Sequence, residues 1–195
     1  MNTKPAEIRA KCRQIHEKMI LILGMETIGF VGLGTMGSEN VKHLLAASFK
    51  VAVFDLDPDC LEKAEAQGAR VVASASGTVE GSDIIFTCLP STEGFAQVME
   101  TELLPAAGED QVFIALDTVI PEVIRGFATR LRETGAWLID APVTGGQWGA
   151  AEASLRMFVG GDRKVVGSVR PVLATLAAED RIVYCGESGS GQVVK

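Results

Sequence analysis

The stretch TIGFVGLGTMG, residues Thr27 to Gly37, decides the fold that we expect for this chain. Its opening residues are mostly apolar and predict a buried β-strand, and three glycines follow at the spacing G-x-G-x-x-G. Gly32 permits a tight turn out of the strand, Gly34 lets backbone amides approach a pyrophosphate, and Gly37 lets the next helix pack closely on the sheet. The stretch therefore predicts a strand–turn–helix unit with a phosphate site at its turn.

A helix and a second strand follow this turn. Ser38 to Ala47 is predicted to be helical, and its N-terminal amides would receive the phosphate oxygens. Lys50 to Phe54 is predicted to be the second strand, and Asp55 follows it directly. In a dinucleotide-binding βαβ unit, an acid about 20 residues after the glycines binds the hydroxyls of the adenosine ribose. This combination favours a dinucleotide site over an ordinary βαβ turn.

Strands and helices alternate along the rest of the chain. The later predicted strands are Arg70–Ala73, Ile84–Leu89, Val112–Leu116, Trp137–Ile139 and Ile182–Tyr184. The later predicted helices are Asp59–Gln67, Thr92–Leu104, Pro121–Glu133 and Arg163–Leu176. Strands that are apolar on both faces and separated by helices are typical of a parallel sheet covered on both sides. We therefore expect one α/β domain over residues 27–189, with a Rossmann-like, doubly wound, mainly parallel sheet.

Composition limits the function classes. The chain has 195 residues, 47% of them hydrophobic and 22% charged, which suits a globular protein of one large domain, or one domain and part of another. A net charge of −7 without a lysine or arginine cluster argues against a nucleic-acid partner. The four cysteines show no metal-binding spacing, so we expect reduced, mostly buried thiols of a cytoplasmic protein. We also expect no metal site, because the two histidines lie far from the predicted site.

Residues 1–26 are predicted to be an N-terminal extension. The apolar run from Met19 to Leu23 is too short to span a bilayer, so we expect no membrane partner. Glu7 and Glu17 weigh against a cleaved signal peptide. The alternative is an upstream start codon, with Met25 as the working start.

Four motifs in order resemble the β-hydroxyacid dehydrogenases, the family that includes 3-hydroxyisobutyrate dehydrogenase and tartronate semialdehyde reductase. GFVGLGTMG is similar to the cofactor signature of that family, and DAPVTGG, residues Asp140 to Gly146, to its substrate signature. GAAEASLRMFVGGD resembles the segment that follows, and GESGSGQVVK the glycine-rich approach to the catalytic lysine. The resemblance covers about Thr27 to Lys195.

The resemblance implies roles for individual residues. Lys195 would be the general acid/base that acts on the substrate hydroxyl or carbonyl oxygen. Thr144, Gly145 and Gly146 would hold the carboxylate of a small 3-hydroxy acid or its semialdehyde, although read alone they suit a simple turn equally well. The residues implied at the cofactor are Gly32, Leu33, Gly34, Thr35, Met36, Gly37, Asp55, Leu89, Pro90 and Thr118. The implied reaction is hydride transfer between the cofactor and this substrate.

We expect the cofactor to be NAD rather than NADP. The carboxylate of Asp55 would face the 2′-phosphate of NADP with like charge. Family members that use NADP commonly place an arginine just after this strand, where this chain has Leu56, Asp57, Pro58 and Asp59. If Asp55 only caps its own loop, the preference would be weak.

Several positions differ from the family pattern. Thr144 replaces the usual serine, and Asp117 stands where the family commonly has serine. Ala115 stands where the family often has aspartate, and Gly94 where some members have asparagine. These differences leave the identity of the hydroxy acid open.

The resemblance implies a helical domain after the lysine, and this sequence ends on Lys195. We therefore expect residues 190–195 to begin an inter-domain helix, the chain to have little activity alone, and the full-length parent to be a homo-oligomer. The alternatives are a stand-alone dinucleotide-binding module without chemistry and an NADP-dependent reductase of the same superfamily. 6-Phosphogluconate dehydrogenase and the imine reductases share the cofactor half, but DAPVTGG argues against the first and Lys195 against the second.

Overall fold

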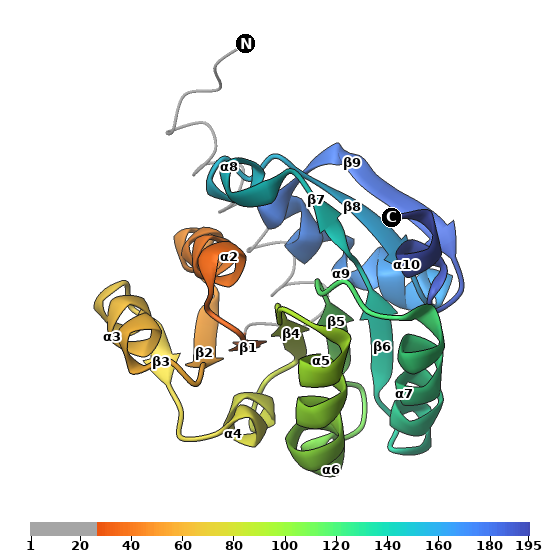
Figure 1. The fold of residues 1–195 in the computed structure, drawn as a ribbon, viewed down its shortest axis with the longest axis horizontal. Helices are drawn as coiled ribbons and strands as arrows, with labels where there is room; N and C mark the ends of the chain where they lie inside the picture. The colour runs from red at the N-terminus through yellow and green to blue at the C-terminus, as the bar shows by residue number, and fades with distance from the viewer. Residues whose placement is uncertain (1–26) are drawn as a thin grey trace.

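The glycine-rich stretch begins with a strand, β1, that lies inside a nine-stranded sheet with the order β3-β2-β1-β4-β5-β6-β8-β7, in which β9 pairs with β8 (Figure 1). The computed structural model describes residues 27–195, and the predicted extension, residues 1–26, lies outside them. The strands are β1 (Thr27–Val31), β2 (Lys50–Phe54), β3 (Arg70–Val71), β4 (Ile84–Thr87), β5 (Val112–Ala115), β6 (Trp137–Asp140), β7 (Val143–Thr144), β8 (Leu155–Gly160) and β9 (Ala177–Gly186).

The pairing of these strands confirms the predicted Rossmann-like, mainly parallel sheet. Strands β1 to β6 pair in parallel, β8 runs antiparallel to β6 and β7, and β9 is parallel to β8. Parallel neighbours need crossover connections, and helices supply them. The helical segments are α2 (Thr35–Ala46), α3 (Pro58–Ala66), α4 (Ala75–Val79), α5 (Thr92–Val98), the π-helix η1 (Met99–Leu103), α6 (Leu104–Ala106), α7 (Pro121–Glu133), α8 (Gly146–Ala151), α9 (Arg163–Leu176) and α10 (Ser190–Val194).

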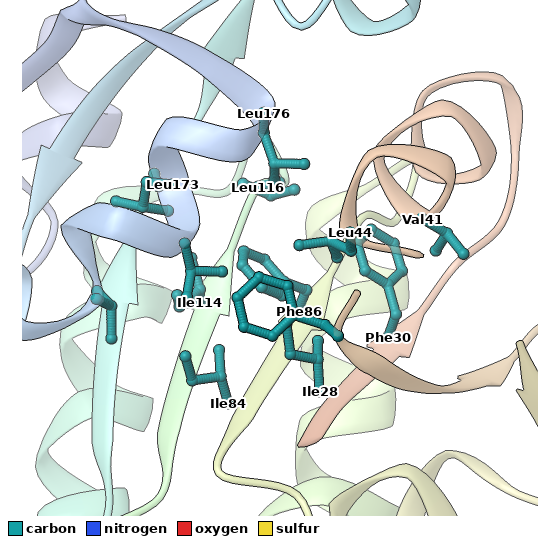
Figure 2. Packing of buried hydrophobic residues seen from close by; sticks show 14 of the residues in the cluster. Ile28, Phe30, Val41, Leu44, Ile84, Phe86, Ile114, Leu116, Leu173 and Leu176 are labelled. Atoms are coloured by element: carbon teal, nitrogen blue, oxygen red, sulfur yellow. The ribbon is translucent and has the colours of Figure 1, made fainter. Parts of the chain in front are cut away.

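Two hydrophobic cores lie on opposite faces of the sheet. Successive residues of a strand point to opposite faces, so Ile84 and Phe86 of β4 enter one core and Ile85 enters the other. The first core is covered by α2 and α9, and in it the rings of Phe30 and Phe86 stack with centroids 5.7 Å apart (Figure 2). The second core is covered by α4, α5, η1 and α7. Burial on both faces explains the continuous apolar runs of these strands.

The structure corrects several predicted boundaries. Helix α2 begins at Thr35 rather than Ser38, and the helix predicted over Thr92–Leu104 consists of α5, η1 and α6. Strand β9 is longer than the predicted segment, and α4, β7, α8 and β8 have no counterpart in the prediction. Strand β8 was not predicted, because its exposed Arg156 interrupts the apolar run that indicates a buried strand.

The cysteines in the described part of the chain have most of their surface shielded from solvent, without being fully buried. Cys60, Cys88 and Cys185 are free thiols, but all three are only partly buried. Cys12 lies outside the described residues. Within residues 27–195, no helix is both long enough and apolar enough to cross a membrane.

Candidate functional site

The three glycines of the turn after β1 have the environments that their predicted roles require. Gly32 has a φ of +96°, and a Cβ there would lie 2.4 Å from the carbonyl oxygen of Cys88. A Cβ on Gly37 would lie 1.9 Å from the carbonyl oxygen of Gly32. At Gly34, in contrast, a Cβ would meet no heavy atom within 4 Å. Two glycines therefore permit close packing, and Gly34 presents its backbone to open space.

That open space is a cavity of about 620 Å³ beside the carboxyl ends of β1, β2 and β4. Its volume is in the ordinary range for a small-molecule or cofactor site. The predicted cofactor residues that line it are Gly32, Gly34, Thr35, Met36, Gly37, Asp55, Leu89 and Pro90. Leu33 instead lines an adjacent cavity of about 320 Å³, which shares Gly34 and Thr35 with the first. Thr118 lines neither cavity.

One wall of the larger cavity is a helix face that the sequence analysis missed. Gly94, Gln97, Val98, Thr101 and Glu102 line the cavity from α5 and η1. Their spacing is i, i+3, i+4, i+7 and i+8, the spacing of one face of a helix. Gly94, Gln97, Thr101 and Glu102, which are small or polar residues at that spacing, were the signal available in the sequence, because the apolar residues of the same segment supply the core.

Asp55 joins the glycine turn to the loop after β2. Its Oδ2 accepts a hydrogen bond from the backbone N–H of Leu33 at 2.5 Å, and its Oδ1 accepts one from the N–H of Asp57 at 2.8 Å. Asp55 therefore caps its own loop. An ionised carboxylate has about four acceptor positions, so both oxygens can still accept hydrogen bonds from a ligand.

The charge that lines the larger cavity is negative. Among its lining residues in the described part of the chain, Asp55 and Glu102 are acids and none is a lysine or arginine. One oxygen of Glu102 accepts a hydrogen bond from the N–H of Ser76 at 3.2 Å. The exposed Lys63 lies along the smaller, adjacent cavity.

Helix α10 places Lys195 beside the loop that follows β5. The Nζ of Lys195 donates a hydrogen bond to Oγ1 of Thr118 at 2.5 Å. The carboxylate of Asp140, at the end of β6, is buried and accepts hydrogen bonds from the N–H groups of Gly189 at 2.7 Å and Gln192 at 3.0 Å. Burial raises the pKa of Asp140, and these backbone hydrogen bonds oppose the rise. Asp140 thus anchors the start of the helix that carries the predicted catalytic lysine.

Gln192 fastens α10 to the same loop from its side chain. Its Oε1 accepts a hydrogen bond from the N–H of Val119 at 3.0 Å, and its Nε2 donates one to the carbonyl oxygen of Asp117 at 2.8 Å. The side chain of Asp117 is buried, and its two oxygens accept hydrogen bonds from Oγ1 of Thr87 and the N–H of Leu89. Sequence reasoning found none of these four hydrogen bonds, because their partners are far apart in the chain.

Burial controls the titration of two groups beside the larger cavity. It raises the pKa of Asp117 to about 6, against the hydrogen bonds from Thr87 and Leu89, which favour the charged form. Burial, together with the nearby charge of Asp117, raises the pKa of Cys88 to about 12. Cys88 is therefore a neutral thiol at neutral pH, with little nucleophilic character.

Thr144, Gly145 and Gly146 form an exposed turn from β7 into α8. Gly145 and Gly146 have φ values of +129° and +58°, and a Cβ on Gly146 would meet open space. Within residues 27–195, no hydrogen bond connects this turn to Lys195. The structure therefore brings Lys195 to Thr118, whereas the predicted carboxylate-binding turn lies on a separate segment.

Comparison with known proteins decides the family. Residues 27–186 match the family described as the NAD binding domain of 6-phosphogluconate dehydrogenase. The chain belongs to this family. The resemblance to the hydroxyacid dehydrogenases is also confirmed, since relatives of this chain are named 3-hydroxyisobutyrate dehydrogenase. The mitochondrial 3-hydroxyisobutyrate dehydrogenase of Drosophila melanogaster is 32% identical over 191 residues, and a probable 3-hydroxyisobutyrate dehydrogenase of Mycobacterium bovis is 37% identical over 171 residues.

Solved structures show the same architecture as this NAD-binding domain. The Mycobacterium tuberculosis 3-hydroxyisobutyrate dehydrogenase with L-serine is 36% identical, with a TM-score of 0.82 over 87% of this chain and 57% of that one. An imine reductase from Pseudomonas sp. is 18% identical with a TM-score of 0.78, which shows a shared fold alone. The alignment with the Drosophila relative covers 98% of this chain but only 58% of that protein. The alignment with the M. bovis relative covers 88% of this chain and 57% of that protein.

Proposed function

We propose that this chain is the cofactor-binding part of an NAD-dependent 3-hydroxyacid dehydrogenase, with Lys195 as its general acid/base. The observation that carries the proposal is the position of Lys195. Helix α10 holds its amine against Thr118 in the loop after β5, and β5 pairs with β4, whose following residues Leu89 and Pro90 line the cavity. In a parallel sheet, ligands bind at the carboxyl ends of the strands, which is the edge these residues share.

The residues at the larger cavity fit a dinucleotide. The exposed amides at the start of α2 and the open face of Gly34 would receive the pyrophosphate, because a helix N-terminus favours negative charge. Asp55 would accept hydrogen bonds from the adenosine ribose hydroxyls with the acceptor capacity that Leu33 and Asp57 leave.

The chemistry divides between cofactor and chain. A bound nicotinamide would supply the hydride acceptor for oxidation or the hydride donor for reduction. The amine of Lys195 would take the proton from the substrate hydroxyl in oxidation, or return it to the carbonyl oxygen in reduction. Thr118 would hold that amine in place, since it already accepts its hydrogen bond. Thr144 and the amides of Gly145 and Gly146 would bind the substrate carboxylate.

The charge distribution favours NAD over NADP as the cofactor. The larger cavity is lined by two acids, Asp55 and Glu102. The 2′-phosphate of NADP would bring a further negative charge to the ribose-binding side of this cavity, where Asp55 lies. Lys63 is the opposing feature, because it lies along the adjacent cavity, within reach of the shared turn. The larger cavity has two acids, whereas the exposed amine of Lys63 lies along the adjacent cavity, so the balance of charge favours NAD.

Turnover tests the proposed reaction. The chain fused after Lys195 to the C-terminal part of the M. tuberculosis relative should reduce NAD in the presence of small 3-hydroxy acids, measured by the absorbance of the reduced cofactor. Lys195→Ala in that fusion should lower kcat by at least about 100-fold, the usual contribution of a general acid/base, with cofactor affinity nearly unchanged. Lys164→Ala, at an exposed lysine on α9, is the matched control. Equal turnover by the Lys195 variant would refute the catalytic assignment.

The same resemblance supports a further proposal, a homo-oligomeric full-length protein. The free thiols of Cys60, Cys88 and Cys185 support another, a cytoplasmic location. Sedimentation of the full-length protein and cell fractionation would test them. A stand-alone module without chemistry would bind the cofactor and show no turnover in the fusion.

A further inference from the structure

A buried carboxylate lies between the cofactor cavity and the segment that carries Lys195. Asp117 directly follows Leu116 after β5, and only 3% of its surface is exposed. Its Oδ2 accepts a hydrogen bond from Oγ1 of Thr87, and its Oδ1 accepts one from the N–H of Leu89. Both partners belong to β4 or to its continuation, and Leu89 lines the cavity. The side chain of Asp117 therefore fixes one wall of the cavity.

The backbone of the same residue binds the other segment. The carbonyl oxygen of Asp117 accepts a hydrogen bond from Nε2 of Gln192, and the N–H of Val119 donates to Oε1 of the same side chain. Thr118, between them, accepts the hydrogen bond from Lys195. One short loop thus contacts the cavity wall through the side chain of Asp117 and α10 through its backbone.

We propose that Asp117 is a positioning residue that couples the cofactor-lining segment 88–90 to the placement of Lys195. This inference rests on the proposed function and deepens it, because it names the group that fixes the cofactor-lining segment relative to Lys195. Asp117 itself lines neither cavity, so it acts through Leu89 on one side and through Gln192 on the other.

The geometry explains why a carboxylate suits this position. Each oxygen has its own partner, one hydroxyl and one backbone N–H, so the two bonds together fix the orientation of the side chain. An apolar side chain would leave the N–H of Leu89 without its present acceptor. An unpaired buried donor is costly, so the 88–90 segment would shift to find another partner. An amide would keep one oxygen for Leu89 and turn its NH2 group toward Oγ1 of Thr87.

The test measures NAD affinity and the reactivity of Lys195 in the 195-residue chain. Calorimetry gives the affinity for NAD, and mass spectrometry gives the rate at which an acetylating reagent modifies Lys195, with Lys164 as the internal reference. In Asp117→Ala, NAD binding should weaken about tenfold and Lys195 should react several-fold faster. In Asp117→Asn, both values should stay within about threefold of the parent, since the amide preserves the contacts.

A structural control separates positioning from general destabilisation. Thr175 is a buried hydroxyl residue of α9 that hydrogen-bonds the carbonyl oxygen of Val172, away from both cavities. Thr175→Ala should leave NAD affinity and Lys195 reactivity unchanged. Two results would overturn the coupling. One is an Asp117→Ala variant that binds NAD as tightly as the parent. The other is an Asp117→Ala variant that binds NAD more weakly while the reaction rate of Lys195 is unchanged.

Gln192→Ala gives an independent answer if Asp117→Ala does not fold. Its side chain lines neither cavity, yet the coupling requires that its loss weaken NAD binding several-fold. NAD affinity equal to that of the parent would refute the inference. Failure of the proposed function has a different signature, because the unmodified chain would then bind neither NAD nor NADP, or would bind a cofactor and show no turnover in the fusion.

Discussion

Single glycines in the turn after β1 have separable roles. Gly37 is confined by the carbonyl oxygen of Gly32, so its missing side chain permits the approach of α2 to the turn. Gly34 is confined by nothing within 4 Å, and its φ of −56° is accessible to alanine. The G-x-G-x-x-G pattern predicts packing for Gly37 and ligand approach for Gly34. The surroundings agree with close packing at Gly37, and the ligand contact of Gly34 stays a prediction.

A pair of alanine substitutions should separate these roles. Gly37→Ala should lower the free energy of unfolding by about 3 kcal/mol or more, because the new methyl overlaps backbone. Gly34→Ala should change it by less than about 1 kcal/mol and weaken NAD binding by about tenfold, because the methyl occupies the approach of the phosphates. Denaturant unfolding and calorimetric titration measure the two effects. Unchanged NAD affinity in Gly34→Ala would show that the turn does not contact the cofactor.

Asp55 should determine the choice between NAD and NADP. The unmodified chain should bind NAD at least several-fold more tightly, since a hydrogen bond to a charged group contributes roughly 1.5–3 kcal/mol. Asp55→Asn is a sharper test than Asp55→Ala, because the amide can still accept the N–H of Leu33 or Asp57 while the charge is lost. The preference should shrink in Asp55→Asn and widen in Lys63→Ala, by calorimetry with both cofactors. Tighter binding of NADP by the unmodified chain would contradict the assignment.

At the scale of one element, α10 depends on its tertiary contacts. Ser190–Val194 is far shorter than a helix that is stable alone in water, so its surroundings must stabilise it. Asp140 accepts hydrogen bonds from N–H groups at its start, and Gln192 joins it to the loop after β5. A Cβ on Gly191 would lie 2.2 Å from the carbonyl oxygen of Phe158, so this close docking on β8 requires glycine.

Asp140→Asn should loosen α10 locally. An amide retains one neutral oxygen, so the N–H of either Gly189 or Gln192 loses its acceptor and the other N–H loses a charged one. A hydrogen bond to a charged group contributes roughly 1.5–3 kcal/mol. Hydrogen exchange of these two amides should accelerate by about tenfold or more. Asp162→Asn is the matched control, because Asp162 caps α9 through the N–H groups of Lys164 and Val165. The control should affect the start of α9 alone, and unchanged exchange at Gly189 and Gln192 in Asp140→Asn would refute the anchoring role.

At the scale of the whole molecule, the sheet separates two hydrophobic cores and carries a buried carboxyl group at its ligand-binding edge. The stability of the folded chain is therefore linked to the ionisation of Asp117. Its pKa is about 6 in the folded chain against an ordinary 3.8, so between these values the folded state holds a proton that the unfolded state has released. Stability contributed by the neutral carboxyl group is lost as the pH rises from about 4 to 6.

Asp117→Asn should remove this pH dependence. A shift of about two pKa units corresponds to about 3 kcal/mol, so the unfolding free energy of the variant relative to the parent should rise by about that amount between pH 4 and pH 7. Urea unfolding of both proteins across this range measures the difference. A difference that does not vary with pH would mean that Asp117 titrates near its ordinary value in the folded chain.

The sequence by itself determined most strands, most helices and the glycine turn, because these depend on neighbouring residues. Apolar runs, helical periodicity and the spacing of Gly32, Gly34 and Gly37 are local signals. The family motifs likewise pointed to Lys195, whose catalytic role stays a prediction. Even the missed cavity face of α5 and η1 was a local pattern, whereas β8 was obscured by an exposed arginine within its apolar run.

Only the tertiary structure decided which strand ends, loops and helices are joined by hydrogen bonds. The contacts of Asp140 with Gly189 and Gln192 span 49 and 52 residues, and that of Gln192 with Asp117 spans 75. The sequence marked Asp117 merely as a departure from a family pattern, and its place between the cavity wall and α10 became visible only in the fold. Such hydrogen bonds depend on which strand ends meet at one edge of the sheet. That arrangement is a property of strand order, which local sequence signals do not contain.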